Sequence, residues 1–257
     1  MTKPTTSVQV YSVRELFVEG KELNTLKEIA AIGYEGIEFT EAIMQYPVDT
    51  VKSWLAEAGL VCTGMAAGWP ALQEGTFEDT LKYLKALGTN NLLIGYATFE
   101  ETRYRDKLAK IIDRINYIYE VASKEGFYVA YHAHYPDFYF VDGVTVWDRI
   151  LQGTPKEFGM CVDTGNMISV GADPVAYLNK YPGKGKVCHL KPFNFRENCP
   201  ATLVDDDGND WKLIVDTCLD VGKAEYLVVE YGSYRCYSAL EAIKLCYERI
   251  CAHVANR

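Results

Sequence analysis

The chain has 257 residues, is 49% hydrophobic and 24% charged, and carries a formal net charge of −9. This is the composition of an ordinary globular protein, and an acidic balance without a run of lysine or arginine argues against a surface for nucleic acid or anionic membrane. No stretch approaches the roughly 20 apolar residues of a membrane span, and the first ten residues lack the apolar core of a secretory signal, so we expect a cytoplasmic protein with reduced cysteines.

The chain alternates short β-rich apolar runs with amphipathic segments. In chain order, strands are predicted at residues 8–13, 36–40, 60–68, 91–97, 128–134, 159–164, 186–193 and 226–232. Helices are predicted between them. The fourth helix has a stripe of apolar residues that we expect to be buried, formed by Leu108, Ile111, Ile112, Ile115, Ile118, Tyr119 and Ala122.

Several helix boundaries carry local signals. Asp173-Pro174 predicts an N-cap followed by proline in the first turn, and residues 76–79 and 238–241 have the spacing of a capping box. Glycine stops six helical patterns, where we expect a left-handed C-cap: Gly33, Gly59, Gly88, Gly126, Gly183 and Gly222.

Eight strand-then-helix units of about 30 residues predict a closed (β/α)₈ barrel, the TIM barrel, as a single domain over residues 1–257. Parallel strands in such a barrel are buried on both faces, which explains their nearly continuous apolar runs. A doubly wound open sheet is the alternative, but its first turn would carry a glycine-rich GxGxxG motif, and VYSVRELFVEG has none.

Polar residues end the last four predicted strands, where a barrel places its chemistry. His132 and His134 end the fifth, Asp163 the sixth, His189 the seventh and Glu230 the eighth. Mixed nitrogen and oxygen donors suit a divalent cation such as Mn²⁺, Co²⁺, Fe²⁺ or Zn²⁺. Taken singly, His189 could be a core histidine, Asp163 a helix cap and Glu230 half of an ion pair.

Other residues near the predicted strand ends are candidates for substrate contacts. We predict that Asp137, Trp69, Phe193 and Arg196 bind substrate. Residues 232–235 follow the last strand, where barrels often bind phosphate. Further aromatic residues could stack on a sugar or only pack in the core: Tyr96, Phe99, Tyr135, Phe138, Phe195 and Tyr231.

Four segments in this order, YVAYHAH, CVDTGNMISVGADP, VCHLKPF and LVVEYG, resemble the last four strands of the xylose-isomerase-like barrels. That superfamily includes sugar epimerases, inosose dehydratases, 3-dehydroshikimate dehydratases and endonuclease IV. GYEGIEF (33–39) is similar to its second strand and residues 208–222 to its seventh helix. The resemblance implies one metal ligand from each of strands five to eight, which here are His132, Asp163, His189 and Glu230. Mn²⁺ is the expected ion, with Mg²⁺, Co²⁺, Fe²⁺ and Zn²⁺ as alternatives.

The chain departs from the family pattern at three places. Many members carry Glu-x-His on strand five, where this chain has His132 and His134; His132 takes the ligand position, although the order could be reversed. Proline follows Lys191 where an aspartate is usual. Asp206 is a candidate replacement for a family glutamate before the seventh helix, with a solvated acidic loop as the alternative.

A divalent ion with open positions can polarise a carbonyl and stabilise the enediolate formed when the adjacent C–H proton leaves. The candidate catalytic groups are His134, Glu230, Lys191 and Glu38. An imidazole on strand five favours one-base chemistry over two-base epimerisation, because the epimerases of this superfamily typically use a carboxylate there.

We therefore predict a metal-dependent sugar isomerase or epimerase acting on a small polyol or keto-sugar. The alternatives are a lyase, which would eliminate from a 3-keto-glycoside or dehydrate a keto-inositol, and a non-catalytic sugar-binding barrel. Nucleic acid is not an expected partner, because endonuclease IV needs more metal-binding histidines. The resemblance implies a homo-oligomer, either a dimer or a tetramer.

Overall fold

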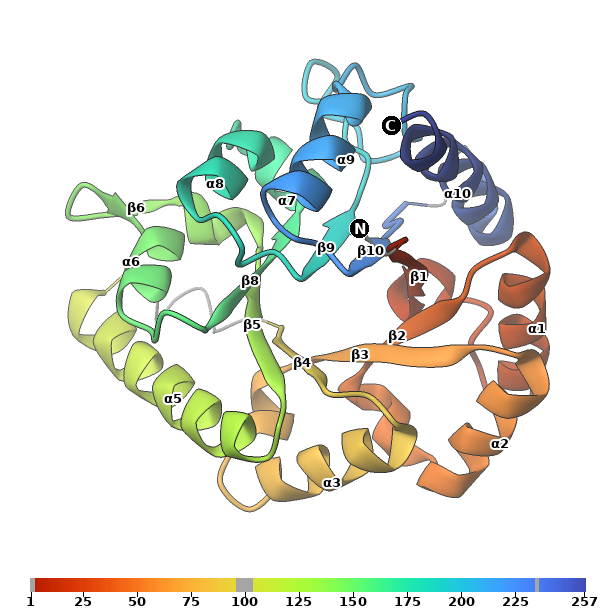
Figure 1. Ribbon diagram of the computed structural model, residues 1–257, viewed down its shortest axis with the longest axis horizontal. Helices are drawn as coiled ribbons and strands as arrows, with labels where there is room; N and C mark the ends of the chain where they lie inside the picture. The colour runs from red at the N-terminus through yellow and green to blue at the C-terminus, as the bar shows by residue number, and fades with distance from the viewer. Residues whose placement is uncertain (1–2, 96–103, 234–235) are drawn as a thin grey trace.

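The computed structural model describes residues 3–95, 104–233 and 236–257. Eight parallel strands close into a barrel in the order β1-β10-β9-β8-β5-β4-β3-β2, with helices around the outside (Figure 1). The predicted (β/α)₈ fold class is confirmed. The barrel strands are β1 (Thr5–Gln9), β2 (Gly36–Thr40), β3 (Val61–Ala67), β4 (Asn91–Ile94), β5 (Tyr128–His132), β8 (Gly159–Asp163), β9 (Val187–Leu190) and β10 (Tyr226–Val229).

The helices form the outer layer, and those among the described residues are too short or too polar to cross a membrane. The α-helices are α1 (Glu22–Ile32), α2 (Val48–Ala58), α3 (Phe77–Leu87), α5 (Arg105–Lys124), α6 (Val146–Gln152), α7 (Thr164–Ile168), α8 (Pro174–Lys180), α9 (Trp211–Asp220) and α10 (Ala239–Ala255). Four short 3₁₀ helices follow barrel strands: η1 (Val10–Val13), η2 (Glu41–Gln45), η3 (Trp69–Leu72) and η4 (Tyr135–Phe138).

The first strand lies earlier than predicted. Residues 5–9 pair with β10 on one side and β2 on the other, whereas residues 10–13 form η1. This strand starts with polar residues, which do not resemble a buried apolar run. Ser7 can nevertheless face the interior because its hydroxyl forms a buried hydrogen bond with the hydroxyl of Thr63, at 2.7 Å. The predicted strand at 8–13 is therefore wrong in its bounds.

Several other strands end earlier than predicted. β5 stops at His132, two residues before His134, and β9 stops at Leu190. β4 stops at Ile94, and the last two residues of the predicted strand 91–97 lie outside the described residues.

A small hairpin between β5 and α6 was not predicted. It joins β6 (Phe140–Val141) to β7 (Val144–Thr145) as an antiparallel pair. The turn between them is Asp142-Gly143, and both residues have positive φ, 50° and 76°. An Asp-Gly dipeptide between short apolar runs is a hairpin signal, so the sequence did contain the evidence for this element.

The predicted helix caps are confirmed in part. Asp173 and Ser238 each accept the predicted backbone hydrogen bond, from Val175 and Glu241. Helix α3 begins after Thr76 as expected, but the predicted capping bond is absent from this described turn because the Thr76 hydroxyl faces the Pro70 and Gln73 carbonyls instead.

Five of the six predicted glycine stops have positive φ, and Gly222 is the exception. The left-handed residue there is Lys223, with φ of 62°. Gly222 is instead required by a close approach, because a Cβ atom at this position would lie 2.7 Å from the carbonyl oxygen of Cys218.

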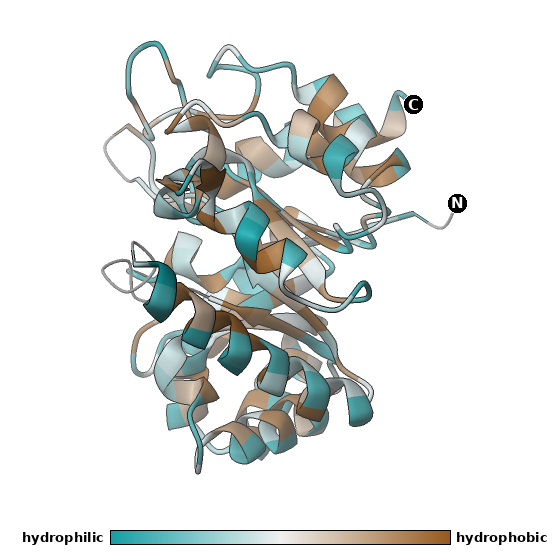
Figure 2. Ribbon diagram, turned by 90° about the vertical axis from the view of Figure 1, so that its left-hand side faces the viewer, coloured by the Kyte–Doolittle hydropathy of each residue, from teal (hydrophilic) through white to brown (hydrophobic). Residues whose placement is uncertain are grey.

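The core has two parts. The larger part fills the space between strands and helices, and in Figure 2 the strands at the centre are mostly hydrophobic while the helices carry both kinds of residue. The predicted stripe on α5 contributes to it, with Ile112 and Tyr119 only partly buried. The smaller part plugs the barrel interior and consists of Ala66, Leu93, Ala130, Cys161, Val187 and Val228. This plug is the floor on which the polar residues at the strand ends lie.

Candidate metal centre

Four polar side chains lie together at the C-terminal end of the barrel. Because side chains alternate along a strand, the residue two positions after each plug residue again points into the barrel. Two positions after Ala130, Cys161, Val187 and Val228 come His132, Asp163, His189 and Glu230. Each of these four residues offers a nitrogen or oxygen atom, and the four atoms all lie within 4.8 Å of one another.

His132 and Asp163 form one half of this cluster. Nε2 of His132 lies 3.3 Å from Oδ2 of Asp163, and the Asp163 side chain is fully buried. The other oxygen of Asp163, Oδ1, accepts the backbone N–H of Asn166 at 2.8 Å and so caps α7. The capping role and the place in the polar cluster are therefore compatible, because each uses a different carboxylate oxygen.

His189 and Glu230 form the other half, with Glu38 behind them. Nδ1 of His189 lies 2.9 Å from Oε2 of Glu230, and its Nε2 lies 2.9 Å from Oε1 of Glu38. The second contact is short but poorly angled, so Nε2 and both Glu38 oxygens are buried without a hydrogen bond in the described part of the chain. Glu38 is 1% exposed and does not line the cavity above the cluster.

Lys191 is held next to both carboxylates of the cluster. Its Nζ donates to Oε1 of Glu230 at 2.8 Å and lies 3.6 Å from Oδ2 of Asp163. Burial opposes the charge on Lys191, but Asp163 and Glu230 outweigh it and raise its pKa. The side chain stays an ammonium group and cannot serve as a base at neutral pH.

The buried charges fit a bound cation. Glu38, Asp163 and Glu230 are three carboxylates with little exposed surface, and their described partners are one ammonium group and two imidazoles. Burial opposes a proton on His189, but Cys161, Glu38 and Glu230 outweigh it, so its pKa lies well above its usual range. A positive charge is thus favoured between these side chains, and a divalent ion would supply it with ligands of the right chemistry.

A second set of three residues, His132, Cys161 and His189, also has its ligand atoms within 4.8 Å of one another. Cys161 precedes Asp163 by two positions on β8, so its Sγ lies in the layer below Asp163. Burial raises the pKa of the Cys161 thiol to about 11, and a bound ion would have to displace this proton. The Cys161 set offers three ligand atoms, whereas the other set offers four, two of them carboxylate oxygens. The set that includes Asp163 and Glu230 is therefore the better metal site.

His134 lies beyond the end of β5, above His132. The two imidazole rings are 4.6 Å apart at an interplanar angle of 72°, and His134 lines the cavity. Burial, aided by the neighbouring His132, lowers the pKa of His134 to about 3. It is neutral at physiological pH, where it can exchange hydrogen bonds with a substrate hydroxyl.

Asp137 holds this segment in place. Its Oδ2 accepts the backbone N–H of His134 at 2.7 Å, and Oδ1 accepts the hydroxyl of Tyr131 at 3.2 Å. The side chain is buried and does not line the cavity above the cluster. The structure thus places Asp137 where it positions His134.

A cavity of about 470 Å³ opens above the cluster. His132, Lys191 and Glu230 are on its wall, as is Tyr135, one of the aromatic residues predicted at the rim. Sequence reasoning missed five polar residues that also line it: Gln9, Tyr11, Thr40, Glu41 and Asn166. Gln9 and Glu41 follow the rule that identified the others, since they end β1 and follow β2, but the misplaced first strand put Gln9 in a strand interior.

The other predicted substrate-binding residues lie away from this cavity. Trp69 lines a separate cavity beside α5, Phe193 bonds through its backbone to Asp207 and Asn209, and Arg196 is exposed. Asp206 pairs with Arg249 at 2.8 Å.

The other aromatic residues predicted at the rim do not line the cavity above the cluster where the structure describes them. Phe138 packs on Trp147, Tyr231 is buried, and Phe195 is exposed beside another cavity. Four residues named in the rim and phosphate-site predictions, Tyr96, Phe99, Tyr234 and Arg235, lie outside the described residues.

Comparisons with known proteins agree with the fold. A family model described as "Xylose isomerase-like TIM barrel" matches residues 26–245. In sequence, the chain is 26% identical over 191 residues to an inosose dehydratase from Geobacillus thermodenitrificans. That match covers 65% of this chain and 61% of the relative, so the chain spans less than two thirds of the curated protein it matches.

Solved structures of similar architecture cover nearly the whole chain. A sugar phosphate isomerase/epimerase from Parabacteroides distasonis is 17% identical with a TM-score of 0.76, covering 99% of this chain and 96% of that one. A probable 3-DHS dehydratase from Bacillus anthracis is 15% identical with a TM-score of 0.71, covering 96% and 98%. At such low identity these matches show the fold alone.

Proposed function

Because the chain belongs to the xylose isomerase-like TIM barrel family, we propose that it is a divalent-metal-dependent enzyme that removes a proton beside the carbonyl group of a small keto-sugar. The observation that carries the proposal is the meeting of four ligand atoms within 4.8 Å at the floor of an open cavity. His132, Asp163, His189 and Glu230 would hold the ion, with Mn²⁺ expected and Mg²⁺, Co²⁺, Fe²⁺ or Zn²⁺ as alternatives. When bound, such an ion withdraws electrons from a carbonyl and makes the neighbouring C–H group more acidic.

The side chains around the cavity would bind and orient the substrate and take up its proton. Lys191 can donate a hydrogen bond to a substrate oxygen, because its ammonium group reaches the cavity wall. Neutral His134 can orient a substrate hydroxyl, while its low pKa makes it a weak proton acceptor. Glu41 lines the cavity outside the proposed ligand set and is the better candidate for taking the proton. Burial opposes ionisation of Glu230, but Lys191 and His189 outweigh it and hold its pKa well below its usual range, which makes Glu230 the weaker base.

Sugar isomerisation or epimerisation is the first candidate reaction. Elimination by a lyase is the second, favoured by the sequence match to an inosose dehydratase and by the imidazole of His132 on β5. To separate them, the Mn²⁺-loaded protein is incubated with keto-sugars, 3-keto-glycosides and keto-inositols in D₂O and followed by NMR. Deuterium entry with all hydroxyls retained indicates isomerisation or epimerisation, and loss of water or an aglycone indicates elimination. Absence of both across the panel would favour a sugar-binding barrel without catalysis.

Asp163→Asn tests the metal centre without removing the α7 cap, because asparagine also accepts the capping bond. The wild-type protein, loaded with Mn²⁺ and desalted, is expected to retain about one ion per chain by elemental analysis, and the variant to lose most of it. Asp173→Asn makes the same change at the cap of α8, outside the cluster, and should retain the ion. Full occupancy in Asp163→Asn would refute the ligand assignment.

A further inference from the structure

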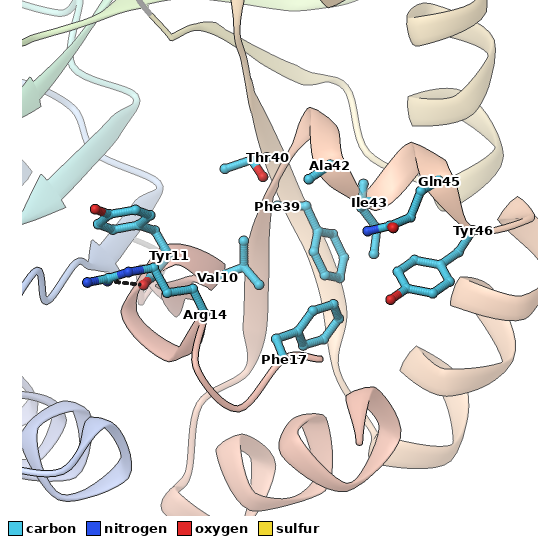
Figure 3. A pocket seen from close by; sticks show the side chains of 10 residues that line it. All are labelled: Val10, Tyr11, Arg14, Phe17, Phe39, Thr40, Ala42, Ile43, Gln45 and Tyr46. Carbon is cyan, nitrogen blue, oxygen red and sulfur yellow. Dashed lines mark hydrogen bonds between the residues drawn. The ribbon is translucent and has the colours of Figure 1, made fainter. Parts of the chain in front are cut away.

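A second, smaller hollow adjoins the cavity above the metal centre. It measures about 130 Å³ and lies between η1 and η2, where Figure 3 shows the side chains around it. We call it the side chamber. Its apolar wall consists of Val10, Phe17, Phe39, Ile43 and the ring of Tyr46.

The wall of the side chamber is built from packed residues. The rings of Phe17 and Phe39 lie 6.0 Å apart at 53°, and Phe39 and Ile43 are buried in the main core. Figure 3 shows the rings of Phe17 and Phe39 next to each other, with Val10 to one side of them.

Two polar side chains of the side chamber have partners of their own. The hydroxyl of Tyr46 donates to Oε1 of Glu22 at 2.6 Å. Arg14 donates to the carbonyl oxygens of Tyr11 and Gly232, with its guanidinium 3.9 Å from the centre of the Tyr11 ring. Thr40 and Gln45 also line the chamber, so it offers an occupant mainly hydrocarbon contacts with polar groups beside them.

The side chamber and the larger cavity share part of their walls. Tyr11, Thr40 and Ala42 line both hollows, so the side chamber lies directly beside the cavity above the metal centre. An apolar cavity of about 150 Å³ is known to hold benzene, so a chamber of about 130 Å³ is of the size of a phenyl ring or a branched alkyl group.

We propose that the substrate carries an apolar substituent of this size, which occupies the side chamber while its hydroxycarbonyl group faces the metal centre. The substrate class is then a keto-sugar with an attached aromatic or branched alkyl group, rather than a free sugar. This inference rests on the proposed function for the polar end of the substrate. Transfer of a phenyl-sized group from water to such walls strengthens binding by about tenfold to a hundredfold.

The test compares hydroxyacetone with a series of 1-hydroxy-2-ketones that end in a phenyl ring after zero to three methylene groups. Affinities are measured by calorimetry on the Mn²⁺-loaded full chain. At least one phenyl ketone is expected to bind ten times more tightly than hydroxyacetone. In the Mg²⁺-loaded protein, the phenyl ring is also expected to shift the methyl NMR signals of Ile43.

One variant reduces the space for the ring, and another serves as a control. Val10→Phe fills the side chamber, so it should abolish the advantage of the phenyl ketones while hydroxyacetone binds as before. Val18→Phe places the same bulk on an exposed residue, 40% accessible, and should change nothing. Equal affinities for all the ketones, or Ile43 signals that do not move, would overturn the proposal.

A metal-free titration separates this inference from the proposed function. Benzyl alcohol has no hydroxycarbonyl group, and it should still shift the Ile43 methyl signals in wild type and not in Val10→Phe. If the protein binds no metal but this shift is present, the metal function fails and the chamber stands. If the metal binds and the shift is missing, the chamber proposal fails alone.

Discussion

At the scale of single residues, the orientation of the His189 side chain depends on carboxylates at two other strands. It lies between Glu230 on one ring nitrogen and Glu38 on the other, each 2.9 Å away. A histidine that binds a metal commonly gives its second ring N–H to a carboxylate, which fixes the tautomer and the ring orientation. We expect this role for Glu38, because its burial keeps it from the substrate. The sequence prediction of Glu38 as a base thus gives way to a proposal that it orients His189.

Glu38→Gln is expected to weaken Mn²⁺ binding by about tenfold to a hundredfold, since the amide orients the imidazole less well. The unfolding free energy of the metal-free variant should fall, because His189 loses one of the carboxylates that favour its protonated form. Calorimetric Mn²⁺ titration and urea unfolding measure the two effects. Glu35→Gln, at an exposed ion pair with Lys3, is the matched control. Unchanged Mn²⁺ affinity in Glu38→Gln would exclude the orienting role.

At the scale of elements, Asp148 fastens α6 to α8. Its carboxylate accepts Nζ of Lys180 at 2.8 Å and the hydroxyl of Tyr181 at 2.6 Å, while its side chain is 9% exposed. Burial opposes ionisation of Asp148, but the hydrogen bonds from Lys180, Tyr181 and Thr145 outweigh it, so its pKa lies below the ordinary value of 3.8. These two short helices therefore depend on one carboxylate for much of their mutual order.

Asp148→Asn should lower the unfolding free energy by about 2 kcal/mol at pH 7, the usual range for a hydrogen bond to a charged group. The folded pKa is depressed, so the stabilisation is complete above the unfolded value of 3.8 and is lost as the pH falls below it. The difference between wild type and variant should accordingly shrink as the pH is lowered from 4 toward 2. Urea unfolding across this pH range measures it, with Asp113→Asn at an exposed site on α5 as the control. If the difference in unfolding free energy between wild type and Asp148→Asn persisted unchanged at the lowest pH, the stabilisation would not come from the ionised carboxylate.

At the scale of the whole molecule, the barrel plug supports the metal centre from below. Leu93 is fully buried in the plug and shares this layer with Ala130, Cys161, Val187 and Val228. Four of these plug residues precede a proposed ligand by two positions, so their packing sets the height and spacing of the cluster. A cavity in the plug should therefore affect both the stability of the barrel and the order of the site.

Leu93→Ala is expected to cost about 3 kcal/mol of unfolding free energy, because it removes buried hydrocarbon and leaves a cavity between packed strands. Mn²⁺ affinity should also fall, since the ligands above lose support. Denaturant unfolding and metal titration check the two effects. Leu213→Ala, at an exposed leucine on α9, should cost less than 1 kcal/mol and leave metal binding intact. A plug variant with wild-type stability would show that the barrel interior is not close-packed.

Much of this architecture was determined by the sequence alone. Apolar runs, helix stripes and glycine stops depend on contacts between near neighbours, so they predicted the closed barrel and most strand positions. The rule that polar residues at the strand ends face the mouth also identified His132, Asp163, His189 and Glu230, whose donor atoms the fold brings together. Their binding of a metal, the cytoplasmic location and the oligomeric state stay predictions.

Only the tertiary structure decided how the side chains of different strands meet. Glu38 carries no local sign of its partner, because His189 lies 151 positions from Glu38 along the chain. Gln9 was missed because pairing with two neighbouring strands overrode the polar start of β1. The side chamber arises where residues after β1 and β2 pack against each other. Local patterns encode each element, whereas distances across the barrel depend on strand pairing and packing that a linear sequence does not display.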